Sequence, residues 1–131
     1  LSDKMFPNDY LIIGNGVREG ERFVGLEKYQ SIFFENWFVN ILYALGFKEG
    51  EVEYDARFAN GRVEGFFVVN TDKVIKHKDR EVKFRKGDEI IVAVQYKYYI
   101  DELNEFCEMY FRKVDVMPDS KGEYVLISCV K

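Results

Sequence analysis

The stretch that decides the fold is Ile90-Ile-Val-Ala-Val-Gln-Tyr-Lys-Tyr-Tyr99. Its first half is an uninterrupted apolar run rich in β-branched residues, which predicts a buried strand. Its second half is a polar aromatic cluster, and a segment of helical character, Ile100 to Tyr110, follows directly. Because α/β sheets bind ligands beyond the C-terminal ends of their strands, the Tyr96-Lys97-Tyr98-Tyr99 cluster is a candidate site. The alternative is a strand end with one buried ring and exposed neighbours.

The segments that follow and precede this stretch add further strands. Lys113 to Val116 and Tyr124 to Val130 predict a closing antiparallel pair, with the turn Pro118-Asp-Ser-Lys-Gly122 between them. Near the start, Asp9-Tyr-Leu-Ile-Ile-Gly14 is a continuous apolar run. Such a run is typical of a strand buried on both faces in a parallel sheet covered by helices.

Gly25 to Leu45 is the strongest helical segment, because its apolar residues recur at helical spacing. The apolar stripe is broad, so we expect a well-buried helix, or one that also contacts a second domain. Gly46 is the expected C-cap.

Two hairpins are predicted between this helix and the Ile90 strand. Glu51 to Phe58 and Arg62 to Thr71 alternate in polarity and flank Ala59-Asn60-Gly61, and Asn-Gly is a strong hairpin signal. Gly65 inside the second strand indicates a bulge or a close approach by backbone or ligand. Val74 to His77 and Glu81 to Phe84 flank a charged turn and predict the second hairpin.

Composition bounds the class of protein. The chain has 131 residues, 47% of them hydrophobic and 17% aromatic, which predicts a single globular domain over residues 1–131. The surplus of rings serves either a thick core or a ring-walled pocket. The net charge is −4 with interspersed signs, so nucleic acid is not the expected partner. The locally basic stretch Lys73 to Lys86 is interpreted as a solvated β-ribbon, with an anion or nucleic-acid patch as the alternative.

Several kinds of site are not predicted. Cys107 and Cys129 lack CxxC spacing and are expected to be buried free thiols, and His77 alone cannot build a histidine metal site. Gly14-Asn-Gly16 does not have the spacing of a dinucleotide-binding loop. The sequence has no signal peptide and no apolar run long enough to span a membrane, so we expect a cytoplasmic protein without membrane contact.

The order of these motifs resembles the C-terminal part of the histidine-specific, S-adenosylmethionine-dependent methyltransferase family. The matching segments are, in chain order, Asp9 to Gly14, Tyr29, Asn36, Leu45-Gly46, Arg62-Val-Glu-Gly65, Tyr96-Lys97-Tyr98, the helix start at Ile100, and Met117-Pro118-Asp119 followed by Gly122. The similarity runs over almost all of the chain and is carried by shared order and spacing, since each motif alone is weak.

The resemblance implies an α/β fold: the C-terminal part of a class I methyltransferase-like mixed sheet with an inserted α+β hairpin region that binds the substrate. It implies that the chain binds a small-molecule acceptor, such as an amino acid or amine. The expected binding and orienting residues are Tyr29, Asn36, Gln95, Tyr96 and Tyr98. Positioning by neutral hydroxyls and ring faces suits such an acceptor, because alignment does much of the catalysis.

The sequence also departs from the family pattern. The acidic residue that holds the imidazole in the family falls at Ala93, its serine at Gln95 and its hairpin methionine at Gly65. Ala93 and Gly65 either leave room for a bulkier or less polar acceptor than histidine or mean that the pocket is degenerate. The glycine-rich cofactor loop of the family would lie before Leu1, so we expect S-adenosylmethionine to bind only with an N-terminal cofactor domain, in the same or another chain.

Three hypotheses of function follow. The first is the substrate-binding half of a methyltransferase. The second is a non-enzymatic binding or assembly domain derived from that fold. The third is a small anion- or nucleic-acid-binding α+β domain that uses Lys73 to Lys86.

The oligomeric state follows from the expected sheet. A sheet that lacks its first strands exposes an edge that should pair with another strand, which makes a homodimer one expected outcome.

Overall fold

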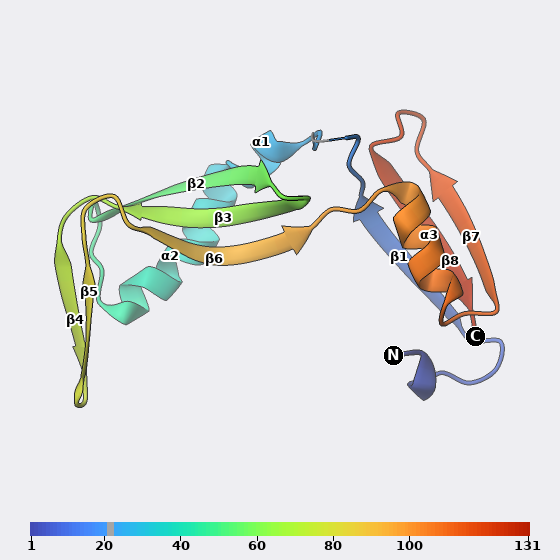
Figure 1. Ribbon diagram of the computed structural model, residues 1–131, viewed down its shortest axis with the longest axis horizontal. Helices are drawn as coiled ribbons and strands as arrows, with labels where there is room; N and C mark the ends of the chain where they lie inside the picture. The colour runs from blue at the N-terminus through green and yellow to red at the C-terminus, as the bar shows by residue number, and fades with distance from the viewer. Residues whose placement is uncertain (21–22) are drawn as a thin grey trace. The chain divides into compact units, whose positions relative to one another are not determined.

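The computed structural model describes residues 1–20 and 23–131 of the chain. They fold as two compact units, of which unit 1 comprises Leu1–Val24 and Lys97–Lys131, and unit 2 comprises Gly25–Tyr96. Figure 1 shows the elements of each unit. Unit 1 contains the 3₁₀ turn η1 (Ser2–Lys4), β1 (Tyr10–Gly16), α3 (Ile100–Glu108), β7 (Lys113–Pro118) and β8 (Tyr124–Val130). Unit 2 contains α1 (Leu26–Tyr29), α2 (Ile32–Leu45), β2 (Val52–Ala59), β3 (Arg62–Val69), β4 (Lys73–His77), β5 (Arg80–Phe84) and β6 (Glu89–Tyr96).

Unit 1 is a three-stranded sheet with α3 packed on one face (Figure 1). The strand order is β1-β8-β7, and β8 is antiparallel to both neighbours, so β1 and β7 run in the same direction. The predicted closing pair is therefore confirmed. The core lies between the sheet and α3 and consists of Val17, Leu103, Cys107, Val125, Ile127 and Cys129.

The prediction that the Asp9 to Gly14 strand is buried on both faces in a parallel sheet is wrong. β1 is antiparallel to β8 and has no second neighbour among the described residues. Leu11 and Ile13 pack on the core, whereas Tyr10 and Ile12 on the other face are 70% and 67% exposed. The apolar run is continuous although only one face of the strand is covered within the described residues.

Unit 2 is built on a second antiparallel sheet of order β2-β3-β6, with α2 against one face. The Asn60-Gly61 turn is confirmed: both residues have positive φ, 53° and 71°, as a two-residue hairpin requires. The register places Tyr54 opposite Phe67 and Ala56 opposite Gly65. The core between sheet and helix is formed by Leu42, Phe47, Phe67 and Val69.

The strand that opens the decisive stretch is less buried than predicted. Within residues 1–20 and 23–131, β6 lies at an edge of its sheet and pairs with β3 alone. Ile91 and Val94 are exposed, while Ile90 and Val92 pack on the core. The predicted irregularity at Gly65 is confirmed, because the pairing of β3 with β6 shifts register between Gly65 and Phe66.

The predicted helix from Gly25 to Leu45 is interrupted, and the prediction that it is well buried is wrong. It divides into α1 and α2 around Gln30, whose amide nitrogen donates to Asp55 Oδ1 at 3.0 Å and to the Ala56 carbonyl at 2.9 Å. Only Leu42 of α2 is buried, and Phe33 and Trp37 are 66% and 63% exposed. Gly46 has a φ of 106° and ends the helix as predicted.

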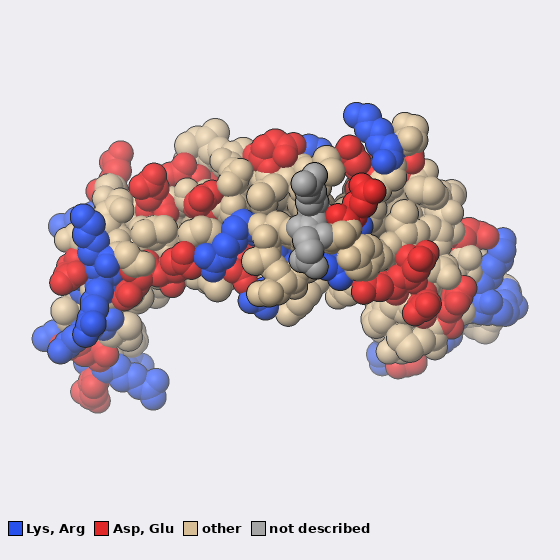
Figure 2. Space-filling model, turned by 45° about the horizontal axis from the view of Figure 1, so that its top comes forward, with Lys and Arg blue, Asp and Glu red and all other residues tan. Residues whose placement is uncertain are grey.

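The second predicted hairpin is also present, as the antiparallel pair β4–β5. Figure 2 shows basic side chains, in blue, gathered at the end of unit 2 that β4 and β5 form. Part of that charge is compensated locally, because Lys76 and Lys83 each lie 3.3 Å from a carboxylate oxygen of Glu81 and Lys73 pairs with Glu51. This agrees with a solvated ribbon.

The fold is thus mixed α/β, with few helices, and every strand pair among the described residues is antiparallel. The described part of the chain contains no helix of the length and hydrophobicity needed to cross a bilayer. The expectation of one domain over residues 1–131 stays a prediction.

Candidate functional site

A small pocket lies in unit 2 between the helical segment and the sheet. Its volume is about 110 Å³. Strands β2, β3 and β6 and both helices contribute to its lining, which comprises Tyr29, Phe34, Phe38, Tyr54, Val63, Gly65, Ala93, Val94 and Gln95. The lining contains no charged side chain, so the pocket suits an uncharged or weakly hydrated group.

Two tyrosines supply most of its polarity. The Tyr29 hydroxyl donates to Gln95 Oε1 at 2.5 Å, and the Tyr54 hydroxyl donates to the Tyr29 carbonyl at 3.0 Å. Burial raises the pKa of Tyr54, and the charges of Asp55 and Glu35 raise it further. Tyr54 therefore stays a neutral hydrogen-bond donor at physiological pH.

Aromatic rings form the helical wall of the pocket. Phe34 stacks on Tyr29 with ring centroids 5.3 Å apart and on Phe38 at 6.1 Å. Tyr54 lies 6.4 Å from Phe38 and 5.1 Å from Phe67. Such a wall can stack on a planar ring or face a cation, since aromatic faces carry a partial negative charge.

On the sheet side of the pocket, two lining residues have small side chains or none. Gly65 and Ala93 are cross-strand partners of β3 and β6. A Cβ at position 65 would lie 2.8 Å from the Tyr54 hydroxyl, which is closer than carbon and oxygen can approach. Gly65 is therefore required for the Tyr54 ring to lie where it does.

Of the predicted site residues, Tyr29 and Gln95 meet in this pocket. Asn36 lies elsewhere on α2, in an open hollow of about 480 Å³ with Phe33, Trp37 and Asn40. The Tyr96 ring faces solvent, and the Arg62 guanidinium carbon lies 6.0 Å from its centroid. The roles predicted for these residues stay predictions.

Tyr98 belongs to unit 1. Its carbonyl accepts a hydrogen bond from the Arg18 amide at 3.1 Å, and its side chain is exposed. Between the two exposed tyrosines, Lys97 is buried, 3% exposed, with its Nζ 4.4 Å from the Phe23 ring centroid. In the Tyr-Lys-Tyr cluster the lysine is therefore the buried member, which differs from the alternative interpretation of one buried ring with exposed neighbours.

Seven further pocket residues were not among the predicted site residues. Gly65 and Ala93 were named only as departures from the family pattern, and the other five are Phe34, Phe38, Tyr54, Val63 and Val94. The hairpin register was the available signal for two of them. Once Asn60-Gly61 fixes the pairing, Tyr54 and Val63 fall on the same face as Gly65.

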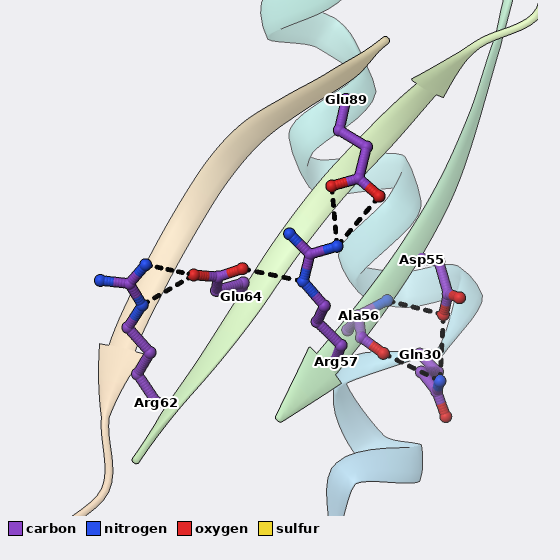
Figure 3. A network of polar contacts seen from close by, with 7 residues as sticks. All are labelled: Gln30, Asp55, Ala56, Arg57, Arg62, Glu64 and Glu89. Carbon is purple, nitrogen blue, oxygen red and sulfur yellow. Dashed lines mark hydrogen bonds and ion pairs between the residues drawn. The ribbon is translucent and has the colours of Figure 1, made fainter. Parts of the chain in front are cut away.

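The opposite face of this sheet carries an ion-pair network, drawn in Figure 3. Glu64 is 3% exposed and accepts from Arg57 Nε at 2.9 Å and from Arg62 Nε at 2.7 Å. Arg57 also donates to both carboxylate oxygens of Glu89, at 2.9 and 2.7 Å. Hydrogen bonds from the two arginines lower the pKa of Glu64. The network crosses all three strands and braces the sheet.

Unit 1 contains a larger hollow of about 420 Å³. It is bordered by Leu1, Ser2, Asp3, Leu11, Ile13, Phe106, Cys107, Tyr110 and Phe111.

Both cysteines are buried and free, as predicted. Burial and the neighbouring Cys107 raise the pKa of Cys129 to about 11. Cys129 is therefore a protonated core thiol rather than a nucleophile. Across residues 1–20 and 23–131, no three His, Cys, Asp or Glu side chains converge on a metal site.

No protein-family model matches the chain, and no curated protein matches its sequence at a significant level.

Proposed function

We propose that the chain is the acceptor-binding part of an S-adenosylmethionine-dependent methyltransferase related to the histidine-specific family, acting on a small amino acid or amine. The single observation that carries the proposal is the pocket. Tyr29, Gly65, Ala93 and Gln95, four positions that the resemblance associates with the acceptor site, lie around one cavity.

The organisation of the chain supports this proposal. Unit 2 is one continuous segment, Gly25–Tyr96, and it interrupts the sequence of unit 1 between Val24 and Lys97. The resemblance implies such an insertion of a helix and a hairpin region, and the pocket lies wholly within the inserted segment.

Unit 1 has the features expected of the end of a larger sheet. Among the described residues one edge of β1 is unpaired, and the strand contains neither charge nor proline to protect that edge. The sheet face away from α3 exposes five large side chains: Tyr10, Ile12, Met117, Tyr124 and Leu126. A cofactor domain that continued the sheet would pair this edge and cover part of this face.

The described residues do not fit the cofactor itself. The aromatic pocket, at about 110 Å³, is far smaller than the roughly 300–1,000 Å³ typical of cofactor sites, and the hollow in unit 1 offers little polarity. S-adenosylmethionine, held by the N-terminal part, would supply an electrophilic methyl group. The chain would hold and orient the acceptor and exclude water from it.

The lining indicates the kind of acceptor. Ala93 provides no carboxylate, so a charged imidazolium or ammonium group has no ionic partner in the pocket. The rings favour an apolar or aromatic side group, and Gln95 and Tyr29 offer hydrogen bonds at one end. The volume of about 110 Å³ is enough for an uncharged ring alone, so we propose that the ring of an amino acid or amine enters the pocket and the rest of the acceptor lies outside it.

Calorimetric titration of the chain with aromatic amino acids and their amines tests the proposal. We expect weak saturable binding that Ala93→Phe abolishes by filling the pocket. Ile91→Phe, on the opposite face of β6, is the matched control and should bind normally. Absence of binding, or equal binding by both variants, would refute the proposed acceptor site.

A methyl-transfer assay of the chain with a cofactor domain separates the enzyme from the non-enzymatic alternative. Binding of an acceptor that is never methylated, with the cofactor domain loaded, would support a binding domain derived from this fold. Methylation that Ala93→Phe abolishes and Ile91→Phe retains would support the enzyme.

A further inference from the structure

The face of α2 that points away from the sheet carries an unusual surface. Phe33, Trp37 and Ile41 follow one another at four-residue spacing and are all exposed. Glu35 is the only charged residue in the helix. Contiguous exposed apolar surface of this kind marks an interaction site in soluble proteins, and a helix with so little charge gives a charged partner nothing to pair with.

The aromatic side chains on this face are held in place by their neighbours. Trp37 stacks on Phe38 with centroids 5.6 Å apart and an interplanar angle of 6°, and Phe33 meets Trp37 edge-on at 6.1 Å. Phe38 in turn packs on the core of unit 2. The surface is thus preorganised, which lowers the entropic cost of docking.

The sequence of this face is self-complementary under a two-fold axis. If two α2 helices pack antiparallel about a point between Phe38 and Val39, Phe33 lies opposite Ala44 of the second copy and Trp37 lies opposite Asn40. Each large ring then meets a small or amide side chain, which allows ridges to pack into grooves. The open hollow bordered by Phe33, Asn36, Trp37 and Asn40 would receive the ring from the second copy.

We propose that this face of α2 is a homodimer interface, formed by antiparallel packing of α2 against α2 of a second copy. The exposed parts of its large side chains amount to roughly 500 Å² per copy, less than the ~800 Å² of a standard interface, so the dimer is weak and reversible. This inference does not rest on the proposed methyltransferase function, and it uses a different surface from the unpaired edge of β1.

Sedimentation velocity from about 10 to about 500 μM tests the proposal, a range chosen for a micromolar dissociation constant. The wild-type chain should shift from monomer to dimer as concentration rises. Trp37→Asp should stay monomeric throughout, whereas Val82→Asp, at an exposed apolar position on β5, should dimerise as wild type. Circular dichroism spectra and thermal melting of each variant establish that it is folded.

A charge pair tests the antiparallel register. Phe33→Lys and Ala44→Asp should each weaken the dimer about tenfold or more, and the double variant should regain affinity because the two introduced charges, of opposite sign, then face each other across the interface. A chain that is monomeric at every concentration would overturn the proposal. So would a dimer that survives Trp37→Asp, as one formed through the β1 edge would, or a double variant no tighter than the single ones.

Discussion

The Tyr29 hydroxyl donates a 2.5 Å hydrogen bond to Gln95 Oε1, joining residues that are 66 positions apart in the sequence. The bond joins two residues of the pocket lining and connects α1 to the end of β6. It aligns the amide of Gln95 with the rings that line the pocket, so it bears on both ligand binding and the folding of unit 2.

Removing either partner of this bond should weaken acceptor binding. We expect Tyr29→Phe and Gln95→Leu each to reduce affinity about tenfold, because a hydrogen bond of this kind contributes about 1 to 1.5 kcal/mol. A double variant should lose little more than either single one, as a calorimetric double-mutant cycle would show. Fully additive losses would mean that the two side chains contact the ligand independently.

Gly65→Ala should destabilise the chain by about 1 to 3 kcal/mol, since the new methyl group would lie 2.8 Å from the Tyr54 hydroxyl. Tyr54→Phe removes that oxygen, and the double variant should therefore recover part of the loss. Urea unfolding measures the free energies. If Tyr54→Phe gives no rescue, the clash is not the cause of the destabilisation.

Acid should weaken unit 2 through Glu64. Its pKa is lowered in the folded state by Arg62 and Arg57, so its contribution to stability is present above the unfolded value of 4.5 and is lost as pH falls through the lower folded value. Glu64→Gln should cost about 1 to 3 kcal/mol at neutral pH. Its unfolding free energy should also fall less steeply than that of wild type below pH 4.5, and parallel pH profiles of the two proteins would contradict this account.

The native thiols should react slowly. Cys129 is buried and its pKa is raised to about 11, so in mildly alkaline buffer the thiolate is a very small fraction. A chromogenic thiol reagent should label the native chain many times more slowly than the urea-unfolded chain. Cys129→Ala should leave one slow thiol, and rapid native labelling of that variant would show that Cys107 is accessible through the hollow in unit 1.

Local signals predicted the hairpins well, because turn chemistry fixes register. The Asn60-Gly61 turn is enough to place Tyr54 and Gly65 on one face, and the pocket depends on that face. The helix beside it was harder to predict. Apolar spacing indicates which side chains share a face but not whether anything covers that face, so Phe33 and Trp37 were expected to be buried and are exposed.

The same limit explains β1. A continuous apolar run is typical of a strand covered on both sides, yet Tyr10 and Ile12 are exposed here because α3 covers only the other face. The ion-pair network could not be predicted at all, since Arg57, Glu64 and Glu89 meet only when three strands are in register.

The hydrogen bond between Tyr29 and Gln95 also closes a loop, because these residues lie close to the two ends of the segment that interrupts unit 1. While residues 25–96 are unfolded, bringing the two parts of unit 1 together costs about 4 kcal/mol of chain entropy. When unit 2 folds, the two ends of residues 25–96 are held close together, and most of this entropic cost is removed. We therefore expect the inserted segment to fold first and the sheet of β1, β8 and β7 to assemble after it.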